Sequence, residues 1–198
     1  MFLRNTSSHP DDEVKALVNF AAEPYDLRHV CVNVKGSRHA YRGRAYSQVP
    51  RDYSNAPRTA KRLVVIAIGT ADKFAEPKSN VYARHSWKRI TEEEFEASIR
   101  NGDGRMVRDR DIWVAGLEQT IFERWTKVSE AKPYGGMKSP VIVYHDWREA
   151  LVGIAAHEFH HIRQFQNKAR CVEAYCERAA AEALARYREK MAGVVSRP

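Results

Sequence analysis

The most constraining feature of this chain is a His-Glu-Phe-His-His run at residues 157–161, which contains the pattern HExxH. Side chains four residues apart lie on the same face of an α-helix, so a helix here brings His157 and His161 within reach of one ion. Asp146 and Glu149 precede the run with the spacing of an N-terminal capping box. The sequence therefore predicts a long helix that begins after Asp146 and carries both imidazoles on one face.

The apolar residues of this helix also recur on one face, at Val152, Ala155, Phe159 and Ile162. His157 and His161 fall at the edge of that face, where the floor of a cleft would lie. His160 points toward the polar side instead. We therefore expect His160 to be exposed or to support the site from its surroundings, and not to bind the metal itself.

The residue types in this pattern suit zinc chemistry. Neutral imidazoles are good ligands for Zn²⁺, and three protein ligands leave the fourth position of a catalytic site to water. A carboxylate beside that water can take its proton while the metal lowers the pKa of the water. Glu158 has the position in the motif for this task. The pattern predicts one zinc ion held by His157 and His161, with Glu158 as the catalytic base.

The segment after this helix offers candidates for a third metal ligand. Projected as a helix, residues 172–190 place Glu173 and Glu177 on an apolar stripe. A carboxylate on such a stripe is costly unless it is paired or bound to metal. We expect Glu173 to be the third ligand, and Glu177 to contact a ligand histidine without binding the metal itself. Glu177, Cys171 and Cys176 remain alternative third ligands.

These two helices carry a family resemblance. His157-Glu158-x-x-His161 followed by Glu173-x-x-Cys176-Glu177-x-x-Ala180 resembles the gluzincin metallopeptidases and looks closest to the small HExxH peptidases of bacteria and phages. In those proteins the second helix carries an E-x-x-A-(D/N/E)-x-x-A pattern, so a cysteine stands here where alanine is usual. The resemblance implies a small zincin-like domain with a short mixed or antiparallel sheet, an active-site helix with HExxH and a following C-terminal helix.

The same resemblance implies an activity, the zinc-dependent hydrolysis of peptide bonds in a protein or peptide substrate. Glu158 would activate the water bound to zinc. A strand at 141–145 would form the edge of a small sheet along which an extended peptide lies. Gln164, one turn beyond His161, would orient a ligand or contact the substrate. The candidates for the donor that stabilises the oxyanion are Tyr187, Tyr175 and His145.

The rest of the chain has the pattern of an α+β domain. Residues 1–10 are predicted to be a flexible N-terminal tail, and residues 11–198 a single domain. Helical patterns cover 11–22, 92–100, 111–128 and 172–190. Thr91 and Glu94 form a capping box for the second of these, and Asn101 to Gly104 would end it. Strand patterns cover 29–35, 40–47, 63–68 and 141–145, with 40–47 as a partner of 29–35 and 63–68 as a central strand. Helices and short strands without regular βαβ alternation favour an α+β fold.

A basic segment from Lys35 to Arg62 supports an alternative function. It carries eight basic residues against one acid, Asp52, in a chain with a formal net charge of +8. Tyrosines lie between them, and basic residues interleaved with aromatic ones suit phosphate neutralisation and base stacking. The alternative is therefore a nucleic-acid-associated protein, either similar to the SprT-like proteases or a non-catalytic binder with a structural or degenerate zinc site.

Cysteine usage and hydropathy bear on the compartment. Three cysteines, Cys31, Cys171 and Cys176, cannot all pair within one chain, which argues against a disulfide framework. Apolar runs long enough to cross a bilayer are absent from the sequence. We therefore expect a cytoplasmic protein without a membrane partner.

Overall fold

The computed structural model describes residues 1–100, 107–114, 119–133, 136 and 138–195. The chain forms two compact units, the first made of Met1–Val81 with Pro133–Pro198 and the second of Tyr82–Lys132. The prediction of a single domain over 11–198 is therefore wrong. An internal segment leaves the first unit, builds a sheet of its own and returns, and the periodicity of single elements does not reveal this.

A four-stranded sheet organises the first unit, with the strand order β1-β2-β4-β3. The strands are β1 (Phe2–Thr6), β2 (Val30–Gly36), β3 (Tyr41–Tyr46) and β4 (Arg62–Ile68). β1 and β4 each pair with β2 in parallel, and β3 pairs with β4 antiparallel. The sheet is mixed, and together with the helices it confirms the α+β class.

β1 corrects the prediction of a flexible tail at residues 1–10. Phe2–Thr6 pairs with β2 along its whole length, from Phe2 opposite Cys31 to Thr6 opposite Lys35. Leu3 packs against the core, whereas its neighbours are polar or exposed. An edge strand needs few apolar side chains, because its backbone hydrogen bonds supply much of its pairing.

β3 lies at the edge of the sheet, next to β4. The prediction that 40–47 pairs with 29–35 is wrong, and the prediction that 63–68 is a central strand is confirmed. The physical reason is burial on both faces. Leu63, Val64 and Ile66 of β4 are fully buried, which a central position provides. The exposed arginines of β3 suit an edge.

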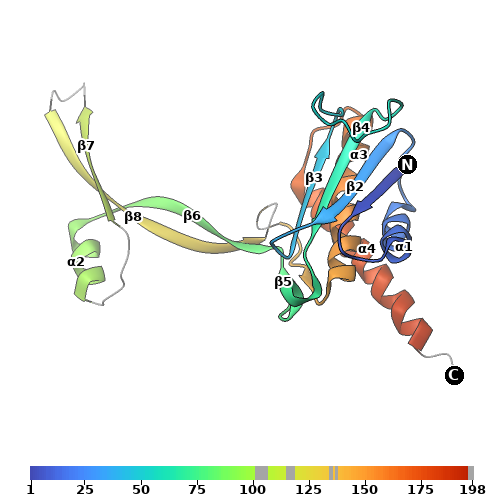
Figure 1. The fold of residues 1–198 in the computed structure, drawn as a ribbon. Helices are drawn as coiled ribbons and strands as arrows, with labels where there is room; N and C mark the ends of the chain where they lie inside the picture. The colour runs from blue at the N-terminus through green and yellow to red at the C-terminus, as the bar shows by residue number, and fades with distance from the viewer. Residues whose placement is uncertain (101–106, 115–118, 134–135, 137, 196–198) are drawn as a thin grey trace. The chain divides into compact units, whose positions relative to one another are not determined.

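Helices cover one face of this sheet: α1 (Asp11–Ala22), α3 (Trp147–Gln166) and α4 (Glu173–Val195) (Figure 1). α3 packs on β3, β4, α1 and α4 and so runs through the middle of the core. α1 buries Val14, Leu17, Val18 and Ala21, the face predicted from the sequence. The central place of α3 explains why its residues from Leu151 to Ile162 are almost all buried.

The predicted cap of α3 is confirmed. A side-chain oxygen of Asp146 accepts a hydrogen bond from the backbone N–H of Glu149 at 2.8 Å. The Glu149 carboxylate accepts a hydrogen bond from the backbone N–H of His145 at 2.8 Å, one residue earlier than in a standard capping box.

Before the cap, the predicted strand 141–145 is reduced to β9 (Val143–Tyr144), which pairs antiparallel with β5 (Lys78–Ser79). A short 3-10 helix, Ala71–Phe74, precedes β5.

The second unit is a three-stranded sheet with the order β6-β8-β7 and one helix. Its elements are β6 (Val81–Ile90), α2 (Glu92–Arg100), β7 (Val107–Val114) and β8 (Gln119–Pro133). The Thr91–Glu94 capping box of α2 is confirmed by both of its hydrogen bonds, at 2.9 and 3.2 Å. The predicted stop at Asn101 to Gly104 lies outside the described residues.

A predicted helix over 111–128 is wrong, because the described residues of this range, 111–114 and 119–128, belong to the antiparallel strands β7 and β8. β8 contains Thr120, Ile121, Phe122, Trp125, Thr126 and Val128, and β-branched and aromatic residues favour strands. Among the described residues, none of the helices combines the length and the apolar character that a membrane span requires.

Candidate metal centre

The two histidines of the HExxH motif lie together inside the first unit. His157 and His161 are one turn apart on α3, with 7% and 9% of their surface exposed. Their ring centroids are 5.0 Å apart. The cap at Asp146 starts the helix and its apolar face packs beneath the sheet, so the fold holds both imidazoles in the interior, where α4 crosses α3.

Glu173, the first residue of α4, brings a carboxylate to both rings. Its Oε2 atom lies 3.3 Å from Nε2 of His157 and 3.4 Å from Nε2 of His161. Among the described residues this oxygen is buried and accepts no hydrogen bond of ordinary geometry. The contacts with His157 and His161 hold the pKa of Glu173 well below its usual range. Three potential metal ligands therefore converge from two helices.

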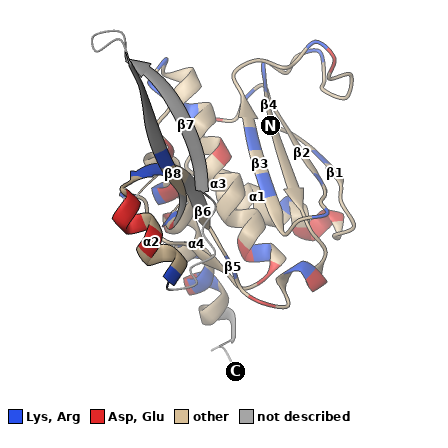
Figure 2. Cartoon of the chain, turned by 90° about the vertical axis from the view of Figure 1, so that its left-hand side faces the viewer, with Lys and Arg blue, Asp and Glu red and all other residues tan. Residues whose placement is uncertain are grey.

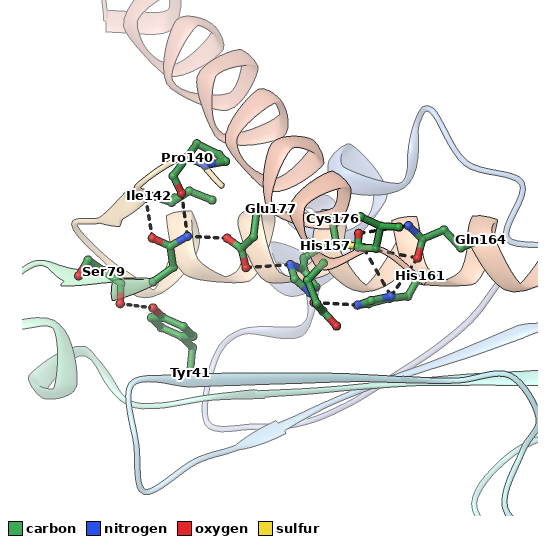
Figure 3. A network of polar contacts seen from close by, with 12 residues as sticks. Tyr41, Ser79, Pro140, Ile142, His157, His161, Gln164, Cys176 and Glu177 are labelled. Carbon is green, nitrogen blue, oxygen red and sulfur yellow. Dashed lines mark hydrogen bonds and ion pairs between the residues drawn. The ribbon is translucent and has the colours of Figure 1, made fainter. Parts of the chain in front are cut away.

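The opposite nitrogens of the two rings contact acceptors (Figure 3). Nδ1 of His157 lies 3.3 Å from Oε1 of Glu177, and Nδ1 of His161 lies 3.2 Å from Oε1 of Gln164. The Gln164 amide donates through Nε2 to the carbonyl of Val172, which leaves its oxygen for His161. When the ring is neutral, as it is when bound to a metal, an acceptor at Nδ1 selects the tautomer with its proton there, so the Nε2 lone pair faces the centre.

The charge of His157 follows from the same neighbours. Burial alone lowers the pKa of this imidazole, but the carboxylates of Glu173 and Glu177 outweigh burial and raise the pKa to about 9. In the metal-free protein at neutral pH, both ring nitrogens of His157 therefore carry a proton, and the ring is positively charged. A cation at this position is favourable because two carboxylates surround it, and a metal ion would take the place of the proton.

Cys176 gives the centre a possible sulfur ligand. The side chains of His157, His161 and Cys176 form a group that could hold a metal ion, with one ligand atom from each lying within 4.8 Å of the others. The Cys176 sulfur lies 3.4 Å from Nδ1 of His161 and 3.8 Å from Oε1 of Gln164. Burial raises the pKa of the Cys176 thiol, so the sulfur is protonated without a metal. Cys171 is exposed and does not join this group.

Glu158 lies between α3 and the edge strand β3. It is buried, with 5% of its surface exposed, and burial raises the pKa of its carboxyl group, an effect that His157 and His161 partly offset. The backbone of Ala45 in β3 also lies near the carboxylate and lowers this pKa. At Gly43 a Cβ atom would lie 2.9 Å from the carboxyl carbon of Glu158. Position 43 therefore leaves room for this side chain because it is a glycine.

Several predicted residues do not reach the centre. The ring of Tyr187 packs edge-on against Phe20 of α1, with a centroid distance of 5.8 Å, in the apolar core. His160 is half-buried and meets the ring of Tyr25 edge-on at 6.3 Å. Tyr175 and His145 are exposed, and His145 contacts Glu149. The positions of Tyr187, Tyr175 and His145 therefore do not support a role for any of them as the hydrogen-bond donor to the oxyanion.

The strand expected to border the site is also a different one. The segment 141–145 contributes only β9 to a two-stranded sheet, whereas β3 is the strand whose backbone meets Glu158. A glycine within a strand pattern indicates close approach of another group to the backbone, so Gly43 was a signal for this contact in the sequence.

Asn80 is a further polar residue near the centre, and sequence reasoning missed it. Its side chain donates to Oε2 of Glu177 at 2.5 Å. Asn80 is 97 residues from Glu177 in the chain, and no local periodicity connects the two positions.

The chain has no counterpart in three comparisons: no family model, no curated protein and no solved structure matches it.

Proposed function

We propose that this chain is a zinc-dependent peptidase whose metal ligands are His157, His161 and Glu173. The observation that carries the proposal is the convergence of both Nε2 atoms on a single buried oxygen of Glu173, at 3.3 and 3.4 Å. Two imidazoles and a carboxylate are a donor set that catalytic zinc uses, and three protein ligands leave one position open.

Glu173 suits the role of third ligand better than Cys176 does. The sulfur contacts Nδ1 of His161, the nitrogen that already faces an amide oxygen of Gln164. A metal ion bound by the Cys176 sulfur and by Nδ1 of His161 would require His161 to lose its contact with Gln164 and to move its ring proton from Nδ1 to Nε2. Binding through Glu173 keeps the outer contacts of both rings, and a carboxylate needs no proton removed to bind.

Zinc, when bound, polarises the scissile carbonyl group and increases the acidity of the attacking water. Glu158 accepts the proton of that water and then donates it to the leaving amine. Its position and its raised pKa favour both steps, because a carboxyl group with a pKa nearer neutrality is a better proton acceptor and donor at neutral pH.

The edge strand β3 offers a place for the substrate. Within the described residues the sheet ends at β3, which runs past Glu158 through Gly43 and Ala45. An extended peptide can pair with the backbone of such an edge, which brings its carbonyl groups close to the carboxylate. The proposed substrate is therefore an unfolded or extended stretch of protein.

The test compares metal content with activity. Wild-type protein is expected to hold about one zinc per chain and to cleave an unfolded protein such as labelled casein. Glu158→Gln should keep the zinc and lose the cleavage, whereas the His157→Ala, His161→Ala double variant should lose both. Unchanged zinc content in the double variant, or full activity in Glu158→Gln, would contradict the proposal.

A second candidate function rests on the outer face of the sheet. The register aligns Arg4 with Arg44 across Asn33 and Val65, and Lys35 with Arg42 across Ala67. These four basic side chains are exposed, and the inward residues of the same strands alternate with them. Figure 2 shows basic residues along β3. The guanidinium group of Arg44 lies 5.0 Å from the ring centre of Tyr46.

This face has the chemistry for a single-stranded nucleic acid, namely positive charge for phosphates and an aromatic ring for a base. The measurement is binding of a fluorescent oligothymidine as a function of salt. A wild-type protein that uses this face loses affinity steeply with salt, and Arg42→Gln, Arg44→Gln reduces the slope. Arg178→Gln, Arg186→Gln on α4 removes equal charge elsewhere and serves as the control. Equal effects of the two pairs would contradict a specific role for the sheet face.

The proposed compartment is a reducing one, such as the cytoplasm. Cys31, Cys171 and Cys176 are all free thiols. Free cysteines are the usual state in a reducing environment.

A further inference from the structure

The side chain of Asn80 joins three parts of the first unit, namely its own segment, the segment 140–142 and α4. Its side-chain Nδ2 donates to the carbonyl of Pro140 at 3.0 Å and to Oε2 of Glu177 at 2.5 Å. Its Oδ1 accepts from the backbone N–H of Ile142 at 2.9 Å. The segments around 80 and 140–142 are thereby tied to each other and to α4.

We propose that Asn80 is a positioning residue for the metal centre, acting through Glu177 on His157. The inference rests on the proposed function, because it assigns a role in holding a ligand of that same site. Asn80 touches neither ligand nitrogen directly. Its effect is transmitted through the carboxylate of Glu177, whose second oxygen lies 3.3 Å from Nδ1 of His157.

The hydrogen bonds of Asn80 determine how its amide is oriented. Both partners of Nδ2 are acceptors, and the partner of Oδ1 is a backbone N–H. A reversed amide would place an oxygen against the Glu177 carboxylate and an NH₂ group against the Ile142 N–H. All of these hydrogen bonds therefore disfavour a reversed Asn80 amide, and Nδ2 of Asn80 keeps donating to Glu177.

The orientation of Glu177 then determines the tautomer of His157. Glu177 is buried, with 4% of its surface exposed, so its two oxygens depend on protein partners. With Asn80 on Oε2, the other oxygen faces His157 and keeps the ring proton on Nδ1. Once a metal ion has displaced the proton from Nε2, the lone pair of this nitrogen, on the side of the ring that faces Glu173, is available to the metal.

The position of Asn80 in the chain gives this contact a further meaning. The chain leaves the first unit after Val81 and returns at Pro133. Asn80 stands immediately before the departure, and its backbone N–H donates to the carbonyl of Ile142 at 3.1 Å, after the return. Any change that separates these two segments removes a donor from Glu177.

The test is a cycle of zinc affinities in four folded proteins. Asn80→Asp keeps the size of the side chain but places a carboxylate oxygen against Glu177. Glu177→Gln places an amide group against the Asn80 amide. Each variant should lower zinc affinity about 10–100-fold, the usual effect of losing an outer partner of a ligand histidine. In the double variant, the new amide at position 177 can donate to the new carboxylate at position 80 and still present its oxygen to His157, so affinity should recover to within a few fold of wild type.

Tyr41→Phe is the matched control, because it removes the hydrogen bond from Tyr41 to the Ser79 carbonyl, 2.7 Å long, without removing a partner of Glu177. Its zinc affinity should equal that of the wild type. The inference is overturned by wild-type affinity in Asn80→Asp, or by a double variant that shows the summed losses of the single ones. Failure of the wild-type protein to bind zinc would instead overturn the proposed function. If Asn80→Asp does not fold, the comparison of Glu177→Gln with the double variant decides the same question.

Discussion

Gly43 of the edge strand β3 lies directly against Glu158 of α3, because a Cβ atom at residue 43 would lie 2.9 Å from the carboxyl carbon of Glu158 and 2.7 Å from Cγ2 of Ile154. The buried carboxylate fits because residue 43 has no side chain. The backbone of the nearby Ala45 lowers the pKa of the same carboxyl group. A strand 115 residues away in the chain thus fixes the position of the proposed catalytic base.

Gly43→Ala should therefore damage catalysis without removing the metal. The added methyl group pushes Glu158 from its place, and loss of a general base lowers kcat by a factor of about 10² to 10⁴. Zinc content should remain that of the wild type, since the ligands lie on α3 and α4. The measurements are kcat on labelled casein and zinc by mass spectrometry.

Gly36→Ala is the control for this variant, because a Cβ at position 36 meets nothing within 4 Å. It should leave both kcat and zinc content unchanged. Wild-type kcat in Gly43→Ala would show that Glu158 is not held by this contact.

Glu173 and Cys176 should differ sharply in their effect on metal binding. Glu173→Gln should lower zinc affinity by more than the 10–100-fold typical of losing an outer hydrogen bond, because it removes a ligand. Cys176→Ala should keep affinity within a few fold of the wild type. Competition with a chelator measures both. A cobalt-substituted protein gives a second readout, since a thiolate ligand would produce a sulfur-to-cobalt charge-transfer band and a carboxylate would not.

Zinc binding should release a proton from His157. The pKa of this histidine is about 9 in the metal-free protein, so at pH 7 the metal must displace its proton, and about one proton should appear per zinc bound. Below pH 9 the affinity should rise with pH, by about tenfold per unit where this proton dominates. Calorimetry in buffers of different ionisation enthalpy counts the protons. Release of about two protons would indicate that the Cys176 thiol also ionises.

Arg188 should stabilise the fold in a pH-dependent way. Its guanidinium group donates to both oxygens of Glu149, at 2.8 and 2.7 Å, and to the carbonyl of Val143 at 2.7 Å. Burial alone raises the pKa of Glu149, but hydrogen bonds from Arg188 and His145 outweigh it and lower the pKa to about 2. Since the folded pKa lies below the unfolded value of 4.5, the stabilisation is complete above pH 4.5 and disappears as pH falls toward 2.

Arg188→Met should therefore lower the free energy of unfolding by about 1 kcal/mol at pH 7, a value that allows for solvent screening of a partly exposed pair. The difference from wild type should shrink below pH 4.5. Arg186→Met, which removes an exposed ion pair with Glu23 at 3.3 Å, should have a smaller effect. Urea unfolding at several pH values checks both variants. A difference that is independent of pH would contradict the role of Glu149.

The parts of the candidate site that lie within one helix could be predicted from the sequence. His157 and His161 share a face of α3 because of helical periodicity, and the Asp146 cap indicates where that helix begins. Glu173 and Glu177 were found because carboxylates on an apolar stripe require a partner. Their contacts with His157 agree with this reasoning.

The parts that depend on distant segments could not be predicted in this way. Asn80 reaches Glu177 through tertiary structure alone, and a single asparagine carries no pattern. Strand pairing also depends on burial across the whole sheet, so the pattern of 40–47 alone predicts the wrong partner strand. The error at 111–128 has a local cause, because spaced apolar residues there fit a helical pattern as well as strands.

The most direct test of the metal centre is anomalous diffraction from crystals of the zinc-loaded protein, measured on both sides of the zinc absorption edge. We expect one strong peak at about 2.0–2.2 Å from Nε2 of His157, Nε2 of His161 and a carboxylate oxygen of Glu173, with a solvent molecule in the remaining position. A zinc bound by the Cys176 sulfur in a closed site of four protein ligands, or a zinc elsewhere in the chain, would contradict the proposed peptidase.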